Sequence, residues 1–237
     1  MRIGLWRWAA VAGGFVVALA MSLIFFSPAA TAIVCPLCFG FERIERALFV
    51  ERPTTTEART QVIKVVALAR ERVRAFYGER RSDPTILICA TDECYRRLGG
   101  GGSRGQAFYD FALMLSPTGL TEIIVAHEMA HIELHARVGF WRVFREAIPV
   151  WFDEGLAVVV SDDPRYLAQG GDRCRVRSES PLPETLREWL RAGDPDRRYA
   201  AAACRVNTWL NSKGGPAAVA ALAERLAGGT DFDTAAR

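Results

Sequence analysis

All three histidines of the chain lie within nine residues, at positions 127, 131 and 135. The first two belong to the segment His-Glu-Met-Ala-His, in which Glu128 follows His127 directly. Residues four apart share one face of a helix, so the imidazoles of His127 and His131 can reach a single metal ion. Glu128 can then lie beside the metal and take a proton from a water molecule. The pattern therefore predicts a metal site with a built-in general base.

A hydrolytic zinc site needs a third protein ligand and an open position. The metzincin pattern HExxHxxGxxH is excluded, because Leu134 and Arg137 stand at its later positions. A glutamate on the following helix is the other common arrangement, and Glu154 is available there. Asp153 competes with it for this role, but the Gly-Leu-Ala run that follows favours Glu154.

The segment HEMAH, followed by P-x-W-F-x-E-G-L-A over residues 149–157, resembles the gluzincin metallopeptidases, especially the peptidase-MA-like group with thermolysin-type active-site helices. The resemblance covers about residues 107–160. It implies that His127, His131 and Glu154 hold Zn²⁺ and that Glu128 is the general base for metal-activated water. It also implies a thermolysin-like zincin fold, with residues 107–115 as an edge strand on which a peptide substrate pairs.

The resemblance leaves several supporting roles open. Thermolysin-type sites carry an aspartate four residues after the glutamate ligand, but this chain has Val158 there, so the partner of a ligating histidine must come from Asp153 or Asp110. His135 is too far around the helix to share the same ion, which favours a supporting or helix-end role. Members of the family often stabilise the oxyanion with a tyrosine or histidine after the second motif, and the tyrosines that the sequence offers there are Tyr166 and Tyr199.

Hydrophobic periodicity predicts the elements that position these residues. A helix is expected to follow the threonines at 54–56 and to end at Gly78. A buried strand is expected over 85–89 and a further strand over 107–115. The histidines lie on a helix over about 118–138, and Glu154 lies on a second one over 150–160. Further helices are expected over 183–191, 199–211 and 217–226. The order indicates an α+β fold. The resemblance implies that residues 54–237 form a metallopeptidase-like domain, which a juxtamembrane segment over 33–53 precedes.

The N-terminus carries an apolar segment, residues 9–26, with Arg2 and Arg7 before it. On a helix these residues would span about 27 Å, which is close to the thickness of the hydrocarbon layer. The basic residues keep the N-terminus in the cytoplasm, so the body is expected outside it. The segment is either a single-pass membrane anchor, or a signal peptide cleaved near Ala32 that leaves a secreted or periplasmic protein.

Six cysteines follow the apolar segment, and an even number in an exported chain predicts disulfides. The simplest pairing joins Cys89 to Cys94 and Cys174 to Cys204. The remaining pair forms Cys35-Pro-Leu-Cys38, which favours a structural bridge or separate partners over a redox dithiol, because no strand precedes it.

Composition excludes other classes of function. The net charge is +3, and two of the positive charges lie ahead of the apolar segment, so the near-neutral body has no electrostatic footprint for nucleic acid. The glycine-rich stretch 99–105 lacks the lysine of a phosphate-binding loop. The sequence thus predicts a zinc-dependent peptidase acting on peptides or proteins outside the cytoplasm. Its alternatives are a non-catalytic zinc-containing envelope scaffold and an exported thiol–disulfide protein.

Overall fold

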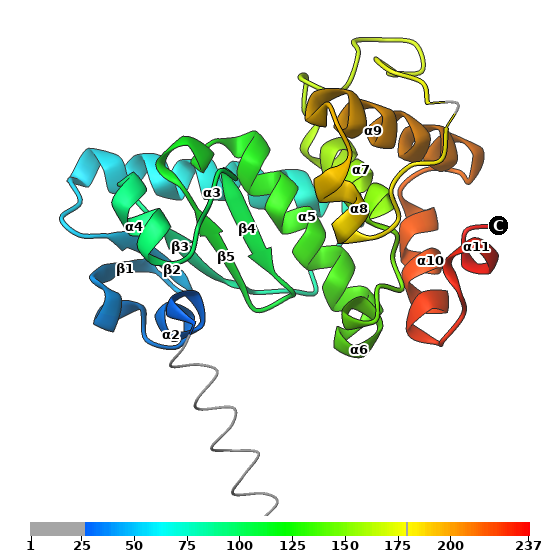
Figure 1. Cartoon of the computed structure of the whole chain (residues 1–237). Coiled ribbons are helices and arrows are strands. Elements are labelled where there is room, and N and C mark those ends of the chain that lie inside the picture. Colours follow the sequence, from blue (N-terminus) through cyan, green and yellow to red (C-terminus); the bar gives the residue numbers. More distant parts are fainter. Residues whose placement is uncertain (1–26, 179) are drawn as a thin grey trace, which may run out of the picture.

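The computed structural model describes residues 27–178 and 180–237 (Figure 1). The apolar segment 9–26 lies outside these residues. Within them, no helix has the length and apolar character needed to cross a membrane. The sheet with α2–α4 forms one half of the molecule in Figure 1, α7–α11 form the other half, and α5 lies between them.

The structure contains one mixed sheet of five strands in the order β1-β2-β3-β5-β4. β2 (Leu48–Glu51), β3 (Thr85–Ile88) and β5 (Ala112–Leu115) are parallel to one another, whereas β1 (Phe41–Glu45) and β4 (Gly105–Phe108) pair antiparallel at the two edges. Together with the helices this is an α+β fold, as the sequence predicts.

Both faces of the central strands are buried, and the side chains alternate between two cores, as strand geometry requires. Ile86 and Ile88 of β3 face the main core between the sheet and the long helices. Leu87 faces a smaller core on the other side, which is covered by α2 (Pro28–Val34) and α4 (Asp92–Arg97). Burial on both faces explains why this strand reads as a continuous apolar run.

The main core is closed by α3 (Thr56–Tyr77), α5 (Glu122–Val138) and α7 (Val150–Ser161), which pack against one another. Thr121 caps α5, because its side chain accepts a hydrogen bond from the backbone N–H of Ile124. The buried carboxylate of Glu133 pairs with Arg137 and accepts the backbone N–H groups of Arg81 and Ser82, at 2.9 and 3.1 Å. These bonds fasten α5 to the loop that leads into β3.

Two expectations about the sheet need correction. Residues 41–51, expected in a juxtamembrane segment, form β1 and β2 of the sheet, and η1 (Pro36–Phe39) precedes them. The prediction of a single strand over 107–115 is wrong, because the chain turns back between β4 and β5. Tyr109 adopts a left-handed conformation (φ 52°) in this turn, which ends the first strand.

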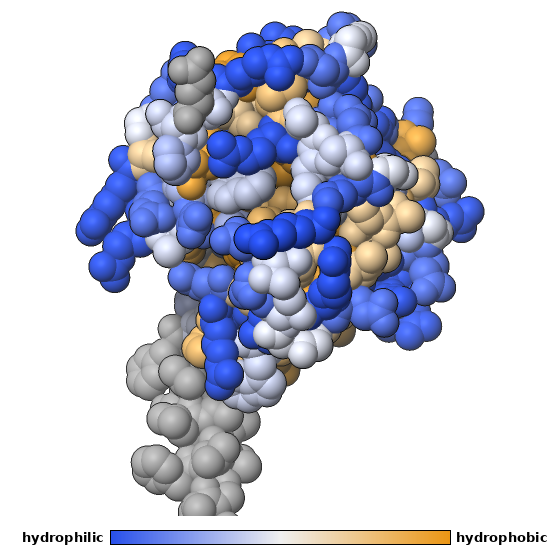
Figure 2. Space-filling model, turned by 90° about the vertical axis from the view of Figure 1, so that its right-hand side faces the viewer, coloured by the Kyte–Doolittle hydropathy of each residue, from blue (hydrophilic) through white to orange (hydrophobic). Residues whose placement is uncertain are grey.

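The C-terminal part is helical, as predicted: α8 (Leu186–Arg191), α9 (Pro195–Ser212), α10 (Ala217–Ala227) and α11 (Phe232–Ala235). The short helices η2 (Pro117–Gly119) and α6 (Phe140–Phe144) flank α5. Figure 2 shows the side of the molecule on which α10 and α11 lie, and hydrophilic residues cover most of it. Amphipathic helices that bury one stripe and expose the other produce such a face.

Three disulfides are present: Cys35–Cys38, Cys89–Cys94 and Cys174–Cys204. The last two are the pairs predicted from the sequence. The first is a local bridge between α2 and η1.

Candidate metal centre

The two metal-site motifs lie on helices that pack against each other. His127, Glu128 and His131 belong to α5, whose four-residue spacing places both imidazoles on the side that faces α7. Glu154 is on α7, which begins directly after Pro149. Residues from separate parts of the sequence thereby meet at the crossing of these helices.

The three predicted ligands converge on one point. His127 Nε2 lies 3.2 Å from His131 Nε2 and 3.3 Å from Glu154 Oε2, and the His131 Nε2 to Glu154 Oε2 distance is 3.6 Å. Zinc bonds of 2.0–2.1 Å in a tetrahedron would place ligand atoms about 3.3–3.4 Å apart. Glu154 Oε2 is buried without a hydrogen-bond partner among the described residues, which is the environment of a metal ligand. The group therefore fits a metal ion.

The electrostatics of Glu154 suit this role. Burial raises the pKa of the carboxyl, but contacts with the imidazoles of His127 and His131 outweigh burial and lower it to about 2. Glu154 is therefore ionised at neutral pH, as a metal ligand must be.

Asp153 contacts the Nδ1 side of the His131 ring, opposite to the ligand group. Its Oδ1 accepts a hydrogen bond of 2.7 Å from His131 Nδ1–H, and its Oδ2 accepts one of 2.8 Å from His135 Nε2–H. An ionised carboxylate only accepts, so the proton of His131 belongs on Nδ1 and its Nε2 lone pair faces the ligand group. One oxygen of Asp153 bonds to His131 Nδ1 and the other to His135 Nε2, so Asp153 groups with these two histidines. Glu154 Oε2 instead groups with the Nε2 atoms of His127 and His131.

Charge interactions among Asp153, His131 and His135 shift the pKa values of Asp153 and His131. Burial raises the pKa of Asp153, but the two imidazoles outweigh burial and hold it well below its usual range. Burial lowers the pKa of His131, but Asp153 outweighs burial and raises it well above its usual value. Protons and a metal ion therefore compete for His131 Nε2.

The other candidate for this supporting role, Asp110, makes no such bond. Its Oδ1 is buried without a hydrogen-bond partner in the part of the chain that the structure describes, and it lies in the turn between β4 and β5. His135 lies with His131 and Asp153 in a second group of ligand-type side chains, separate from the group of His127, His131 and Glu154. Its imidazole bonds to Asp153 and stacks on the ring of Tyr109, with centroids 6.1 Å apart.

Glu128 is held between the ligand group and strand β4. Burial raises the pKa of its carboxyl, the nearby imidazoles of His127 and His131 lower it, and a backbone bond from Ala107 also lowers it. A Cβ atom at Gly105 would lie 2.7 Å from Glu128 Cγ, so the glycine makes room for this side chain. From the sequence, Gly105 belongs only to a glycine-rich loop, because its contact with Glu128 depends on the packing of β4 against α5.

A second glycine positions Glu154. A Cβ atom at Gly155 would lie 2.6 Å from the backbone oxygen of Ala202 on α9, so the absence of a side chain lets α7 and α9 approach closely. From the sequence, Gly155 is recognisable only as part of the motif that contains Glu154. The signal that could have identified it is its position directly after Glu154 in the sequence.

Of the two candidate tyrosines, Tyr199 lies nearer to the ligand group. Its ring centroid is 6.2 Å from that of His127, and burial together with the charges of Glu154 and Glu128 raises the pKa of its hydroxyl. Tyr166 stacks on Tyr199 at 5.1 Å, and its hydroxyl donates to Asp196 Oδ1 at 3.4 Å. Tyr166 therefore supports the ring of Tyr199.

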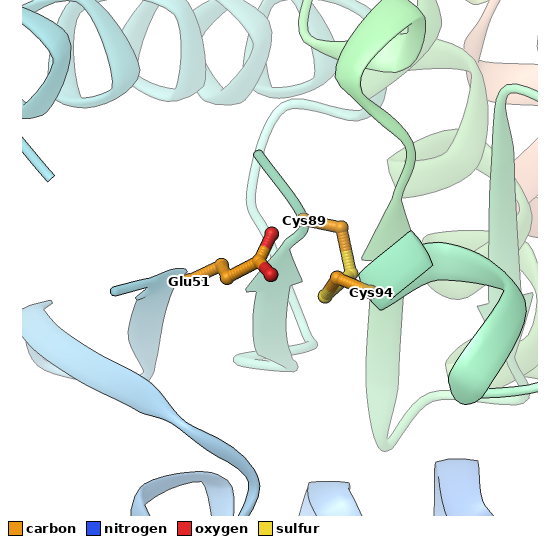
Figure 3. A group of neighbouring side chains, drawn as sticks. All are labelled: Glu51, Cys89 and Cys94. Atoms are coloured by element: carbon orange, nitrogen blue, oxygen red, sulfur yellow. A yellow bond between two sulfur atoms is a disulfide. The ribbon is translucent and has the colours of Figure 1, made fainter. Parts of the chain in front are cut away.

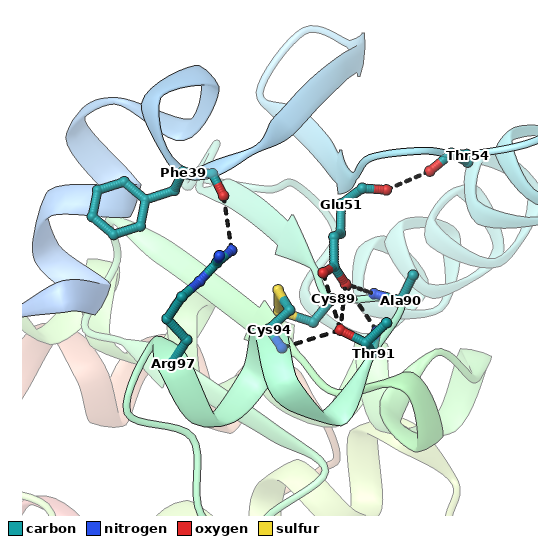
Figure 4. The surroundings of a disulfide bond; sticks show 8 residues. All are labelled: Phe39, Glu51, Thr54, Cys89, Ala90, Thr91, Cys94 and Arg97. Atoms are coloured by element: carbon teal, nitrogen blue, oxygen red, sulfur yellow. Dashed lines mark hydrogen bonds between the residues drawn. A yellow bond between two sulfur atoms is a disulfide. The ribbon is translucent and has the colours of Figure 1, made fainter.

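Another group of ligand-type residues, Glu51 with Cys89 and Cys94, has a different explanation. Figure 3 shows the Glu51 carboxylate pointing toward the Cys89–Cys94 bridge, whose sulfurs are bonded to each other. The carboxylate accepts hydrogen bonds of 2.9 Å from the backbone N–H groups of Ala90 and Thr91 (Figure 4). Glu51 therefore ties the end of β2 to the start of α4.

In comparisons with known proteins, the chain matches no protein-family model, no curated protein and no solved structure.

Proposed function

We propose that the protein is a zinc-dependent peptidase that hydrolyses peptide bonds of proteins or peptides outside the cytoplasm, with a gluzincin-type site on a thermolysin-like domain. The observation that carries the proposal is the convergence of His127, His131 and Glu154 with Glu128 buried beside them. Structural zinc sites almost always have four protein ligands, whereas catalytic sites have three and an open position. The three ligands and the adjacent carboxylate thus favour catalysis over a scaffold.

Zinc, when bound, supplies a Lewis acid that activates water at neutral pH and polarises a carbonyl. The carboxylate of Glu128 accepts a proton from the attacking water and returns it to the leaving amine nitrogen. Tyr199, protonated because burial and nearby carboxylates raise its pKa, can donate a hydrogen bond to the developing oxyanion. A peptide substrate can add to the outer edge of β4, the edge strand beside Glu128, by backbone hydrogen bonds.

The proposed location has support from the cysteines. Three disulfides are typical of proteins in an oxidising compartment, which agrees with a body exported by the apolar segment 9–26. The sequence favours retention of this segment as a membrane anchor over its cleavage.

The test compares zinc content and peptide hydrolysis in three variants of the full chain. Glu154→Ala should lose both zinc and turnover, whereas Glu128→Gln should keep about one zinc per chain and lose turnover. Glu224→Ala removes an exposed glutamate of α10 and should change neither. Full activity of Glu128→Gln would refute the mechanism. Zinc without turnover in the native chain on a broad peptide library would instead support the scaffold.

A further inference from the structure

An exposed cluster of aromatic side chains lies next to the candidate metal centre. Phe140, Trp141 and Phe144 of α6 contact one another, with ring centroids 5.2–6.3 Å apart. Tyr109 and Phe111, from the turn between β4 and β5, contact Phe140 at 5.2 and 6.3 Å. These five residues, here called the aromatic cluster, form one continuous group from two distant parts of the sequence.

The outer members of the aromatic cluster are largely exposed: Phe144 is 71% exposed, Trp141 67% and Phe111 58%. Contiguous apolar surface of this kind marks a site of interaction. The backbone beneath the cluster is firmly held, because the Arg142 side chain donates hydrogen bonds of 2.8 Å to the carbonyl oxygens of Leu226 and Thr230. These bonds therefore fix α6, which carries Phe140, Trp141 and Phe144, to the C-terminal helices.

The position of the aromatic cluster points to its partner. The apolar segment 9–26 ends one residue before Ser27, and α2 begins at Pro28 with Ala29 and Ala32 buried in the fold. If residues 9–26 cross a bilayer, hardly any linker separates the bilayer from the folded body. Figure 1 shows α2 and α6 on the same, lower side of the molecule. Val34, the last residue of α2, and Leu37 of η1 are exposed apolar residues next to this point.

The chemistry of the aromatic cluster fits the boundary between lipid and water. Trp and Tyr are enriched at this boundary, and interfacial segments bury Trp, Phe and Leu side chains in it. The flanking residues Arg145 and Glu146 are exposed and opposite in charge, so the contact is apolar and does not require anionic lipid.

We infer that the aromatic cluster docks onto the outer surface of the lipid bilayer in which the N-terminal segment is anchored. The inference rests on the membrane anchorage in the proposed function. Because Tyr109 also stacks on His135, docking would hold the metal centre at a fixed distance from the lipid surface. The peptidase would then act on segments of membrane proteins that lie close to this surface.

A single introduced cysteine can test this in the full chain. All six native cysteines are in disulfides, so Phe144→Cys provides the one free thiol for a fluorescent label. Leu190→Cys is the matched control, because Leu190 is 72% exposed on α8, which lies higher in Figure 1. Trp141→Cys is a second probe of the cluster.

Each labelled chain is reconstituted in phosphatidylcholine vesicles with or without brominated lipid, and vesicle flotation confirms insertion. We expect brominated lipid to quench the labels at positions 144 and 141 several-fold more than the label at 190. Equal quenching at all three positions in floating vesicles would overturn the inference, as would failure of the chain to float. If the fluorescence of the label at position 144 changes with protein concentration and not with brominated lipid, a second copy of the chain is the partner and the inference is overturned. The measurement requires neither zinc nor activity, so it is independent of the test of the peptidase.

Discussion

Asp153 provides the most direct test of how the metal centre is organised. Its carboxylate holds His131 Nδ1 at 2.7 Å and His135 Nε2 at 2.8 Å, and it is largely buried. Loss of such a supporting group typically weakens metal affinity by about 10–100-fold. This corresponds to about 1.4–2.7 kcal/mol of binding free energy at 25 °C.

Replacement of Asp153 by Asn and by Ala should weaken metal affinity by amounts at opposite ends of this range. Asp153→Asn keeps an oxygen that can accept from His131 but loses the charge, so we expect a loss of about tenfold in zinc affinity. Asp153→Ala leaves both imidazole N–H groups without their acceptor, and we expect a loss of about a hundredfold.

Zinc affinity can be measured by competition with a chromophoric chelator at constant pH. Asp110→Asn is the matched control, since it makes the same chemical change at an aspartate that bonds, among the described residues, to neither His127 nor His131. It should leave the affinity unchanged. Thermal unfolding in excess chelator separates a change in fold stability from a change in metal binding. Unaltered affinity in Asp153→Ala, or an equal loss in Asp110→Asn, would refute the assignment.

Three further perturbations have defined outcomes. Gly105→Ala should displace the Glu128 side chain. Because a small misplacement of a catalytic group can cost on the order of a hundredfold in rate, we expect kcat to fall by about this factor. Zinc content measured by atomic absorption should stay unchanged. Gly155→Ala should force α7 away from Ala202 and cost about 1–3 kcal/mol of unfolding free energy in denaturant titrations, together with weaker zinc binding through Glu154. Removal of zinc should lower the thermal midpoint, because free metal at a hundred times its Kd stabilises the fold by about 2.7 kcal/mol; a midpoint that is insensitive to chelator would contradict a native metal site.

Local patterns predict the parts of the fold that depend on neighbours in sequence. The spacing of His127 and His131 determines their common helix face, and the helices around both motifs lie where periodicity places them. Strand β3 is equally clear, because Ile86, Leu87 and Ile88 are buried on both faces of the sheet.

The features that sequence reasoning missed depend on contacts across the fold. β1 and β2 are short, and only their pairing with each other and with β3 identifies them as part of the sheet. The division between β4 and β5 depends on the left-handed conformation of Tyr109, a residue type that rarely adopts it. The sequence left Asp153 and Asp110 open as the partner of a histidine. Asp153 accepts hydrogen bonds from both His131 and His135 because α5 and α7 cross at that level, which spacing along either helix does not reveal.

The Cys174–Cys204 bridge has a topological consequence. It closes a loop of about thirty residues, for which the chain-entropy model gives about 3–4 kcal/mol of stabilisation. The loop includes several exposed arginines, such as Arg187 and Arg191, which trypsin-like enzymes can attack. A single cut anywhere between the two cysteines leaves both fragments covalently joined, and Cys204 lies on α9, the helix that packs against the Glu154-bearing α7. A chain nicked in this loop by a neighbouring protease therefore remains one molecule.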